Sequence, residues 1–221
     1  MRIKRRPWAD ELYAENQDLF RKFPYDLRGK WHEVFKNNQP IELEIGAGKG
    51  GFITQLAQNN PNKNYIALEI NEMALAYLLR KQAEKRLTNL FLVVGNADEV
   101  GQYFAEGEVS NLYLNFSDPW PKSKHEKRRL TAPNFLRKYH QILATDATIQ
   151  FKTDNQGLFI YSITTMANEP EVLIDKINFD LHHSDDNVGN IRTEYEQKFA
   201  DKGQPIYLLK SHFKEEKNER I

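Results

Sequence analysis

Residues 42–52 read ELEIGAGKGGF and place a glycine-rich turn between an apolar run and a helical pattern. Glycine lets a backbone pass close to a ligand, and the first turn of a helix presents unpaired N–H groups. The glycines fit G-x-G-x-G, with Gly46, Gly48 and Gly50, or G-x-G-x-x-G, with Gly51 last. Such a strand–turn–helix unit predicts a site for an adenosine-containing ligand.

Short apolar runs that fit strands buried on both faces recur along the chain, at Ile41–Ile45, Tyr65–Glu69, Leu90–Val94, Leu112–Phe116 and Thr148–Phe151. Helical periods lie between them. We expect Asn71 to cap one helix and Thr131 to cap another, in front of Pro133. The alternation predicts a doubly wound, Rossmann-like α/β fold, with a mostly parallel sheet and helices on both faces.

The two ends of the chain depart from this alternation. Val172–Phe179 and Pro205–Phe213 predict an antiparallel pair of strands at the sheet edge, separated by a polar segment, 184–203, with room for a short helix. Residues 1–35 are expected to form a basic arm and a helix outside the core. Residues 36–221 then form a single Rossmann-like domain.

Composition excludes several classes of protein. The chain has 221 residues, 40% of them hydrophobic and none of them cysteine. Iron–sulfur ligation through Cys, Cys-type zinc sites and Cys nucleophiles are therefore excluded, and the six histidines lack metal-ligand spacing. No apolar run approaches the roughly 20 residues of a membrane helix, and no secretory h-region follows the N-terminus. We expect a cytoplasmic protein without a metal or a membrane partner.

The formal net charge is zero, yet basic residues gather in two places. Residues 1–6 carry four bases and no acid, and residues 122–129 carry five bases against Glu126 alone. Phosphate contacts need local positive potential rather than a high overall charge. This distribution permits a polyanionic partner; the alternative is a solvated face and a disordered basic start.

Three polar positions narrow the choice of nucleotide. Glu69 ends the second strand, where a carboxylate can accept both hydroxyls of an adenosine ribose, in NAD or in S-adenosylmethionine. Glu44 lies beside the glycines, where it would repel a pyrophosphate but suit the ammonium of a methionine tail. Asn96, followed by Ala97, comes after the third strand and can read an adenine edge, or else is only a turn residue. The set favours S-adenosylmethionine.

The fourth strand ends in NFSDPWPK, residues 115–122. Two prolines stiffen this turn around Trp120, at the sheet edge where open α/β sheets bind ligands. We expect Asp118 to face the pocket, Trp120 to offer a face for a purine, and Lys122 to begin the basic segment. The alternative is a rigid turn without a further role.

These motifs, together with DPWPKSKHEKRRL (118–130), KTDN (152–155) and TEYEQKF (193–199), resemble the bacterial tRNA (guanine-N7-)-methyltransferases, which are class I S-adenosylmethionine-dependent enzymes. The resemblance spans nearly the whole chain and implies methyl transfer to N7 of a guanine in the variable loop of tRNA. One departure is Lys124, where the family more often has Arg; the ammonium keeps the charge but loses bidentate phosphate binding.

The resemblance also implies roles for individual residues. The S-adenosylmethionine contacts would be Glu44, Gly46, Gly48, Gly50, Glu69, Asn96, Ala97 and Asp118, with Asp118 also the catalytic residue. Contacts to the target nucleotide would be Lys122, Asp154, Thr193, Glu194, Tyr195 and Glu196. The RNA-binding segment would be Lys124, His125, Glu126, Lys127, Arg128 and Arg129. Spacing alone equally permits a capping box, with Thr193 as the cap and Glu196 three residues later. A monomer and a homodimer both stay open.

Guanine N7 carries a lone pair, so methylation there needs no base to remove a proton. In-line positioning should do most of the work, while Asp118 and Asp154 stabilise the cation that develops on the purine. Other readings stay open: another Rossmann-fold RNA or adenine amino-methyltransferase, an NAD-dependent oxidoreductase, and a non-catalytic RNA-binding module. Methylation at a pyrimidine C5 through a thiol is excluded.

Overall fold

The computed structural model describes residues 6–214, so the first five residues of the expected basic arm lie outside the described part. Eight strands form one sheet: β1 Phe20–Lys22, β2 Ile41–Ile45, β3 Asn64–Glu69, β4 Leu90–Val94, β5 Val109–Asn115, β6 Leu143–Thr153, β7 Val172–Asn178 and β8 Tyr207–Phe213. The α-helices are α1 Pro7–Glu15, α2 Trp31–Phe35, α3 Gly51–Asn59, α4 Glu72–Lys85, α5 Val100–Tyr103, α6 Pro133–Ile142, α7 Gln156–Asn168 and α8 Glu194–Ala200. Short 3-10 turns are η1 Tyr25–Leu27, η2 Ala97–Glu99, η3 Ser123–Arg128, η4 Leu181–His183 and η5 Asp185–Asn187.

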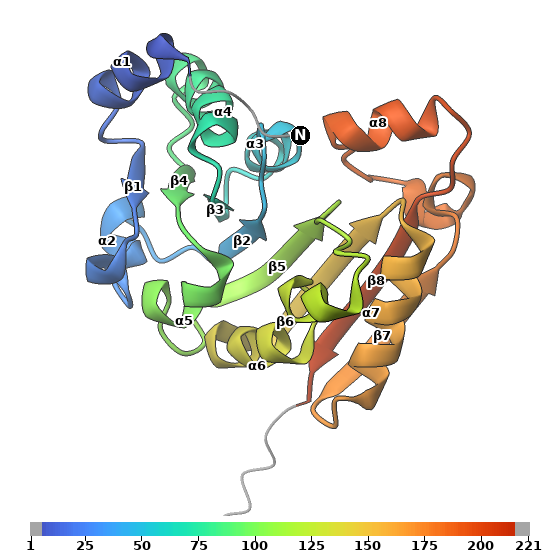
Figure 1. The fold of residues 1–221 in the computed structure, drawn as a ribbon. Helices are drawn as coiled ribbons and strands as arrows, with labels where there is room; N and C mark the ends of the chain where they lie inside the picture. The colour runs from blue at the N-terminus through green and yellow to red at the C-terminus, as the bar shows by residue number, and fades with distance from the viewer. Residues whose placement is uncertain (1–5, 215–221) are drawn as a thin grey trace, which may run out of the picture.

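The strand order is β1-β4-β3-β2-β5-β6-β8-β7 (Figure 1). Strands β1 to β6 pair in parallel, whereas β8 runs antiparallel between β6 and β7. The expected α/β fold with an antiparallel edge pair is confirmed. The order reverses between β2 and β5, and open α/β sheets bind ligands at the carboxyl ends of the strands beside such a reversal.

Each face of the sheet has its own apolar core because residues along a strand alternate between the faces. On β3, Tyr65 and Ala67 pack with α3 and α4, while Ile66 and Leu68 pack with α2, α5, α6 and α7. All four side chains are at most 1% exposed. This double burial explains why the central strands are continuous apolar runs.

Three local expectations have different outcomes. Asn71 caps α4 as expected, because its side chain accepts from the backbone N–H groups of two residues in the first turn. The expected Thr131 cap is wrong: Ala132 is the N-cap of α6, and the Thr131 hydroxyl instead pairs with Ser162 at 2.7 Å. Strand β5 ends at Asn115, because Phe116 has a φ of +52° and leaves the extended conformation.

Residues 6–35 contribute more to the sheet than a separate arm and helix would. Strand β1 pairs with β4, and the Trp31 side chain is fully buried in the larger core. Its indole N–H donates to the Tyr103 carbonyl at 2.9 Å. Helix α1 does pack on the outside, against α4.

Candidate active site

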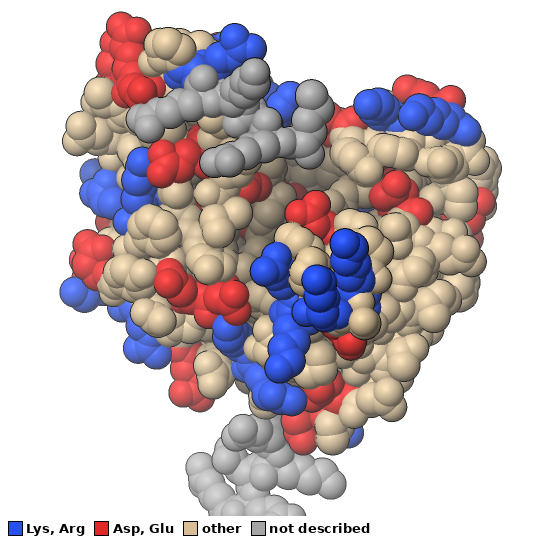
Figure 2. Space-filling view, in the orientation of Figure 1, with Lys and Arg blue, Asp and Glu red and all other residues tan. Residues whose placement is uncertain are grey.

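The candidate site lies where the strands of the parallel sheet end, between α3 and α4 on one side and α8 on the other (Figure 1). Figure 2 shows the surface hollowed over this edge. The predicted residues come to this edge from the ends of β2 to β6, from the loops that follow these strands and from the start of α8. The topology therefore gathers residues that are far apart in the sequence.

The glycine turn is shaped for close approach. Gly46, Gly48 and Gly50 have φ values of +80°, +56° and +72°. A Cβ on Gly50 would lie 2.1 Å from a Leu78 methyl carbon, so any other residue there would have to displace the buried Leu78 side chain. A Cβ on Gly46 would meet nothing within 4 Å. The turn is thus packed against α4 behind Gly50 and open to solvent at Gly46, where a ligand can approach.

Glu69 is held in place by backbone donors. Its two carboxylate oxygens accept from Gly48 N at 2.9 Å and from Asn71 N at 2.8 Å, and the side chain is half-buried. A carboxylate has about four lone-pair positions, so each oxygen keeps acceptor capacity. A pair of neighbouring hydroxyls, as in a ribose, is the matching donor.

Two buried acceptors beside the glycine turn lack a partner. Asn115 Nδ2 donates to Glu44 Oε1 at 2.8 Å, which leaves Glu44 Oε2 and Asn115 Oδ1 without hydrogen bonds. Unpaired buried acceptors are costly and point to a donor that binds there. Burial raises the pKa of Glu44 to about 7, against the lowering effects of Asn115 and the Lys152 charge. A bound cation would favour the charged carboxylate.

Asn96 takes part in a turn. Its side-chain oxygen accepts from Asp98 N at 3.0 Å and caps η2, as the turn interpretation predicted. The amide nitrogen takes no part in this cap. Ala97 packs against the larger core, and Asp98 forms an ion pair with Lys138 at 2.7 Å.

The Asp118 turn is strained and is held from behind. Phe116 and Trp120 both adopt positive φ, +52° and +40°, a rare conformation for bulky residues that tends to mark functional sites. The Arg129 guanidinium donates to the Pro119 and Trp120 carbonyls, each at 3.1 Å. Asp118 itself is exposed at the tip of the turn.

Arg129 is therefore engaged inside the protein. Its guanidinium also lies 4.2 Å from the centre of the Tyr161 ring, and the side chain is half-buried. The Trp120 ring, expected to be open to a purine, packs edge-on with His125 at 5.6 Å and has the Arg128 guanidinium at 4.9 Å.

Tyr195 is influenced by the charges of both predicted carboxylates. Burial, and then the negative charges of Asp154 and Asp118, raise the pKa of the Tyr195 phenol. Its ring lies 5.2 Å from that of Phe116, in the Asp118 turn. Burial also raises the pKa of Asp154. The strand ends of β5 and β6 and the first turn of α8 thus share one side of the cleft.

The segment 193–196 forms the predicted capping box: the Thr193 hydroxyl accepts from Glu196 N at 2.8 Å, and the Glu196 carboxylate accepts from Thr193 N at 3.3 Å. Glu194 forms an ion pair with Lys81 on α4 at 2.6 Å. Glu196, however, is fully buried in an ion pair with Lys152 at 2.7 Å. Sequence reasoning missed Lys152, although a lysine directly after an apolar strand run was a usable signal.

The basic segment after β5 is mostly free to meet a partner. Figure 2 shows Lys and Arg side chains gathered below the hollow, over the segment that follows β5. Lys122 precedes the 3-10 turn η3 and is exposed, and the exposed side chains within η3 are Lys124, Glu126, Lys127 and Arg128. His125 is half-buried.

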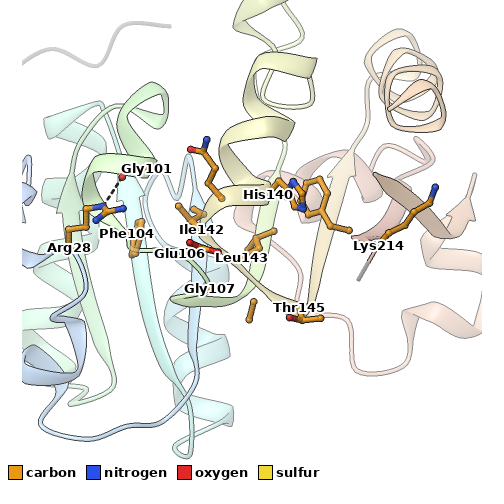
Figure 3. A pocket seen from close by; sticks show the side chains of 13 residues that line it. Arg28, Gly101, Phe104, Glu106, Gly107, His140, Ile142, Leu143, Thr145 and Lys214 are labelled. Atoms are coloured by element: carbon orange, nitrogen blue, oxygen red, sulfur yellow. Dashed lines mark hydrogen bonds between the residues drawn. The ribbon is translucent and has the colours of Figure 1, made fainter. Parts of the chain in front are cut away.

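A cavity of about 900 Å³ lies at the opposite end of the sheet, lined by residues before β5 and around the start of β6 (Figure 3). There Arg28 Nε donates to the Gly101 carbonyl at 3.0 Å. None of the predicted site residues lines it. Within residues 6–214, no group of three or more His, Asp or Glu side chains is arranged to hold a metal ion. Across the same residues, no helix has the length and apolar character to cross a bilayer.

Comparison with known proteins adds relatives by sequence. A family model described as "Putative methyltransferase" matches residues 38–209. A tRNA (guanine-N(7)-)-methyltransferase of Latilactobacillus sakei is 50% identical over 214 residues, which cover 97% of this chain and 100% of that protein. A protein of the same name from Bacillus licheniformis is 46% identical, with the same coverage.

Solved structures show the same fold at low identity. A 16S rRNA methyltransferase superposes with a TM-score of 0.66 and 13% identity, covering 84% of this chain and 93% of that one. An antibiotic-related methyltransferase gives a TM-score of 0.64 at 17% identity, covering 83% and 93%.

Proposed function

The chain belongs to the tRNA (guanine-N(7)-)-methyltransferase family, and from this premise we propose that it transfers the methyl group of S-adenosylmethionine to N7 of a guanine in tRNA. The observation that carries the proposal is the pair of unpartnered buried acceptors, Glu44 Oε2 and Asn115 Oδ1, beside a glycine turn. The family resemblance expected from the sequence is confirmed. The oxidoreductase and the non-catalytic module are no longer needed as alternatives.

The residues at the strand ends fit the methyl donor group by group. Glu44 and Asn115 would accept hydrogen bonds from the donor's ammonium, a cation that suits two neighbouring free oxygens. Glu69, fixed by Gly48 N and Asn71 N, would accept from the ribose hydroxyls. The Asn96 amide would meet the adenine edge. When bound, the donor supplies a methyl group activated by its positive sulfur.

The chain's own part in catalysis is placement and charge. The charges of Asp154 and Asp118 both act on the Tyr195 phenol and raise its pKa, so we propose that both carboxylates serve the same side of the cleft. As the methyl group reaches N7, the purine becomes cationic, and nearby carboxylates stabilise that charge more than the neutral ground state. Burial raises the pKa of Asp154, because removal from water disfavours the charged carboxylate, and a cation that develops beside it would compensate for this cost. No group is required to remove a proton from N7.

The exposed bases Lys122, Lys124, Lys127 and Arg128 supply positive potential next to this cleft. They would contact tRNA phosphates, while Arg129 holds the Asp118 turn through two carbonyls. Because tRNA is the proposed substrate, we place the protein in the cytoplasm.

The test is incubation of the protein with methyl-labelled S-adenosylmethionine and unmodified tRNA, followed by mapping of the labelled base. We expect label on one guanine and aniline-sensitive strand scission at that nucleotide. A matched tRNA with 7-deazaguanosine at that position has no N7 and should accept no label. Label on an adenine amino group would support the amino-methyltransferase alternative, and absence of label from both tRNAs would refute the proposal.

A further inference from the structure

The fully buried Lys152, at the end of β6, is absent from the mechanism above. Its ammonium donates to Glu196 Oε2 at 2.7 Å, to the Ile191 carbonyl at 3.0 Å and to Asn190 Oδ1 at 3.1 Å. All three acceptors belong to one short segment, 190–196, that leads into α8. A buried ammonium is stable only when its donors are paired, so burial of Lys152 and placement of this segment depend on each other.

Both oxygens of the Glu196 carboxylate, like the ammonium of its partner Lys152, are taken up by hydrogen bonds. Besides Lys152, Oε2 accepts from Thr193 N at 3.3 Å. Oε1 accepts from Asn190 Nδ2 at 2.8 Å and pairs with His182 Nε2 at 2.8 Å. The side chain is 0% exposed. Glu196 therefore has no free edge for a nucleotide, in contrast to its three neighbours in the segment 193–195.

Lys152 also lies near residues of the proposed S-adenosylmethionine site. Its ammonium lies 5.2 Å from the centre of the Phe52 ring, which follows the glycine turn. The charge of Lys152 lowers the pKa of Glu44, and the charge of Glu69 raises it. Lys152 thus influences the Glu44 carboxylate, the proposed ammonium site, and also holds the segment that leads into α8.

We propose that Lys152 is a positioning residue, and that its buried ion pair with Glu196 holds α8 so that Thr193, Glu194 and Tyr195 face the target nucleotide. The inference rests on the proposed function and assigns Glu196 to support rather than to substrate contact. The exposed Lys81–Glu194 pair and the Phe116–Tyr195 ring contact guide the same helix from the other side. The Lys81–Glu194 pair is partly solvated, and exposed ion pairs contribute little to stability.

The first test needs no substrate. Hydrogen exchange of the full chain is measured in Lys152→Met and in Glu196→Gln, which keeps the shape of the side chain. We expect amides of residues 190–200 to exchange at least about tenfold faster, with the core strands unchanged. Lys63→Met is the control, because Lys63 pairs with the buried Glu42 at 2.7 Å just before the start of β3, at the opposite edge of the sheet from the candidate site. Equal exchange in wild type and both variants would overturn the proposal.

The second test separates positioning from stability. With tRNA as substrate, we expect the KM for tRNA to rise about tenfold in either variant, while kcat at saturating tRNA stays within about threefold. In Lys152→Met the pH midpoint of donor binding should also move upward, because Glu44 loses its positive neighbour and keeps Glu69. Unchanged KM and unchanged midpoint in folded variants contradict the role.

The two proposals fail in distinguishable ways. A wild-type protein without methylation of tRNA refutes the proposed function, whereas the exchange experiment still decides the role of Lys152. Should Lys152→Met fail to fold, Glu196→Gln carries both measurements, because glutamine keeps the shape of the side chain and one acceptor oxygen while its amide N–H₂ takes the place of the other. An active enzyme with normal exchange and normal KM in that variant refutes the positioning role alone.

Discussion

The raised pKa of Glu44 makes a quantitative prediction about donor binding. Burial raises this pKa to about 7, and the proposed partner of the carboxylate is an ammonium. Binding therefore selects the ionised form, and below pH 7 the protein must first lose a proton. The ionised fraction falls from about three quarters at pH 7.5 to about 3% at pH 5.5, so affinity should fall about 25-fold, or about 1.9 kcal/mol.

Isothermal titration calorimetry with S-adenosylhomocysteine measures this directly. The product keeps the ammonium that Glu44 is proposed to bind and lacks the sulfonium charge. At pH 6 we expect about 0.9 proton released per ligand bound, seen as a dependence of the binding heat on the ionisation enthalpy of the buffer.

Glu44→Gln is the control, because glutamine keeps an acceptor oxygen for Asn115 and does not titrate. This variant should bind more weakly at pH 7.5 and lose most of the pH dependence. A wild-type affinity that is flat from pH 7.5 to 5.5, or a variant with the full wild-type profile, would refute the reasoning.

Three further predictions concern other parts of the site. Asp118→Ala should lower kcat on tRNA by about 10²-fold or more, the size seen when one preorganised electrostatic group is removed. Single-turnover methylation measures this loss. Near-wild-type turnover would contradict the role of Asp118. Lys124, Lys127 and Arg128 should be neutralised together. The slope of log K for tRNA binding against log salt, measured by filter binding, should then fall by about 2 to 3. The affinity for S-adenosylmethionine should not change. Gly50→Ala should lower the free energy of unfolding by about 1–3 kcal/mol in thermal unfolding, because the new Cβ meets Leu78 at 2.1 Å. Gly203→Ala is the control: it has a φ of +69° but nothing within 4 Å of the new Cβ, so it should cost less. Equal losses would contradict the packing argument.

The parts of the fold that could be predicted share one physical property. Strands β2, β3 and β4 are buried on both faces, so their sequences are unbroken apolar runs with clear ends. Asn71 caps α4 because it directly precedes a regular helical pattern. Strand β1 has only three residues, too few for any periodicity, and it is stabilised by β4 rather than by its own sequence.

The site was predictable where one residue type suits one backbone position. The glycine turn and Glu69 follow from local sequence, and the structure joins them through Gly48 N. The partnership of Glu44 with Asn115 depends on β2 and β5 being neighbours, which no local pattern states. Likewise, the capping box at Thr193 was visible from spacing, but its burial against Lys152 is a tertiary contact.

The placement of β8 has a consequence for how the polypeptide matures on the ribosome. The final described strand inserts between β6 and β7, and in the structure β7 pairs with no other strand. During synthesis the six parallel strands can assemble first, while the free edge of β6 stays open to unwanted pairing until β8 emerges. A nascent chain stalled shortly before Pro205 would hold a nearly complete sheet in which the edge of β6 is unpaired.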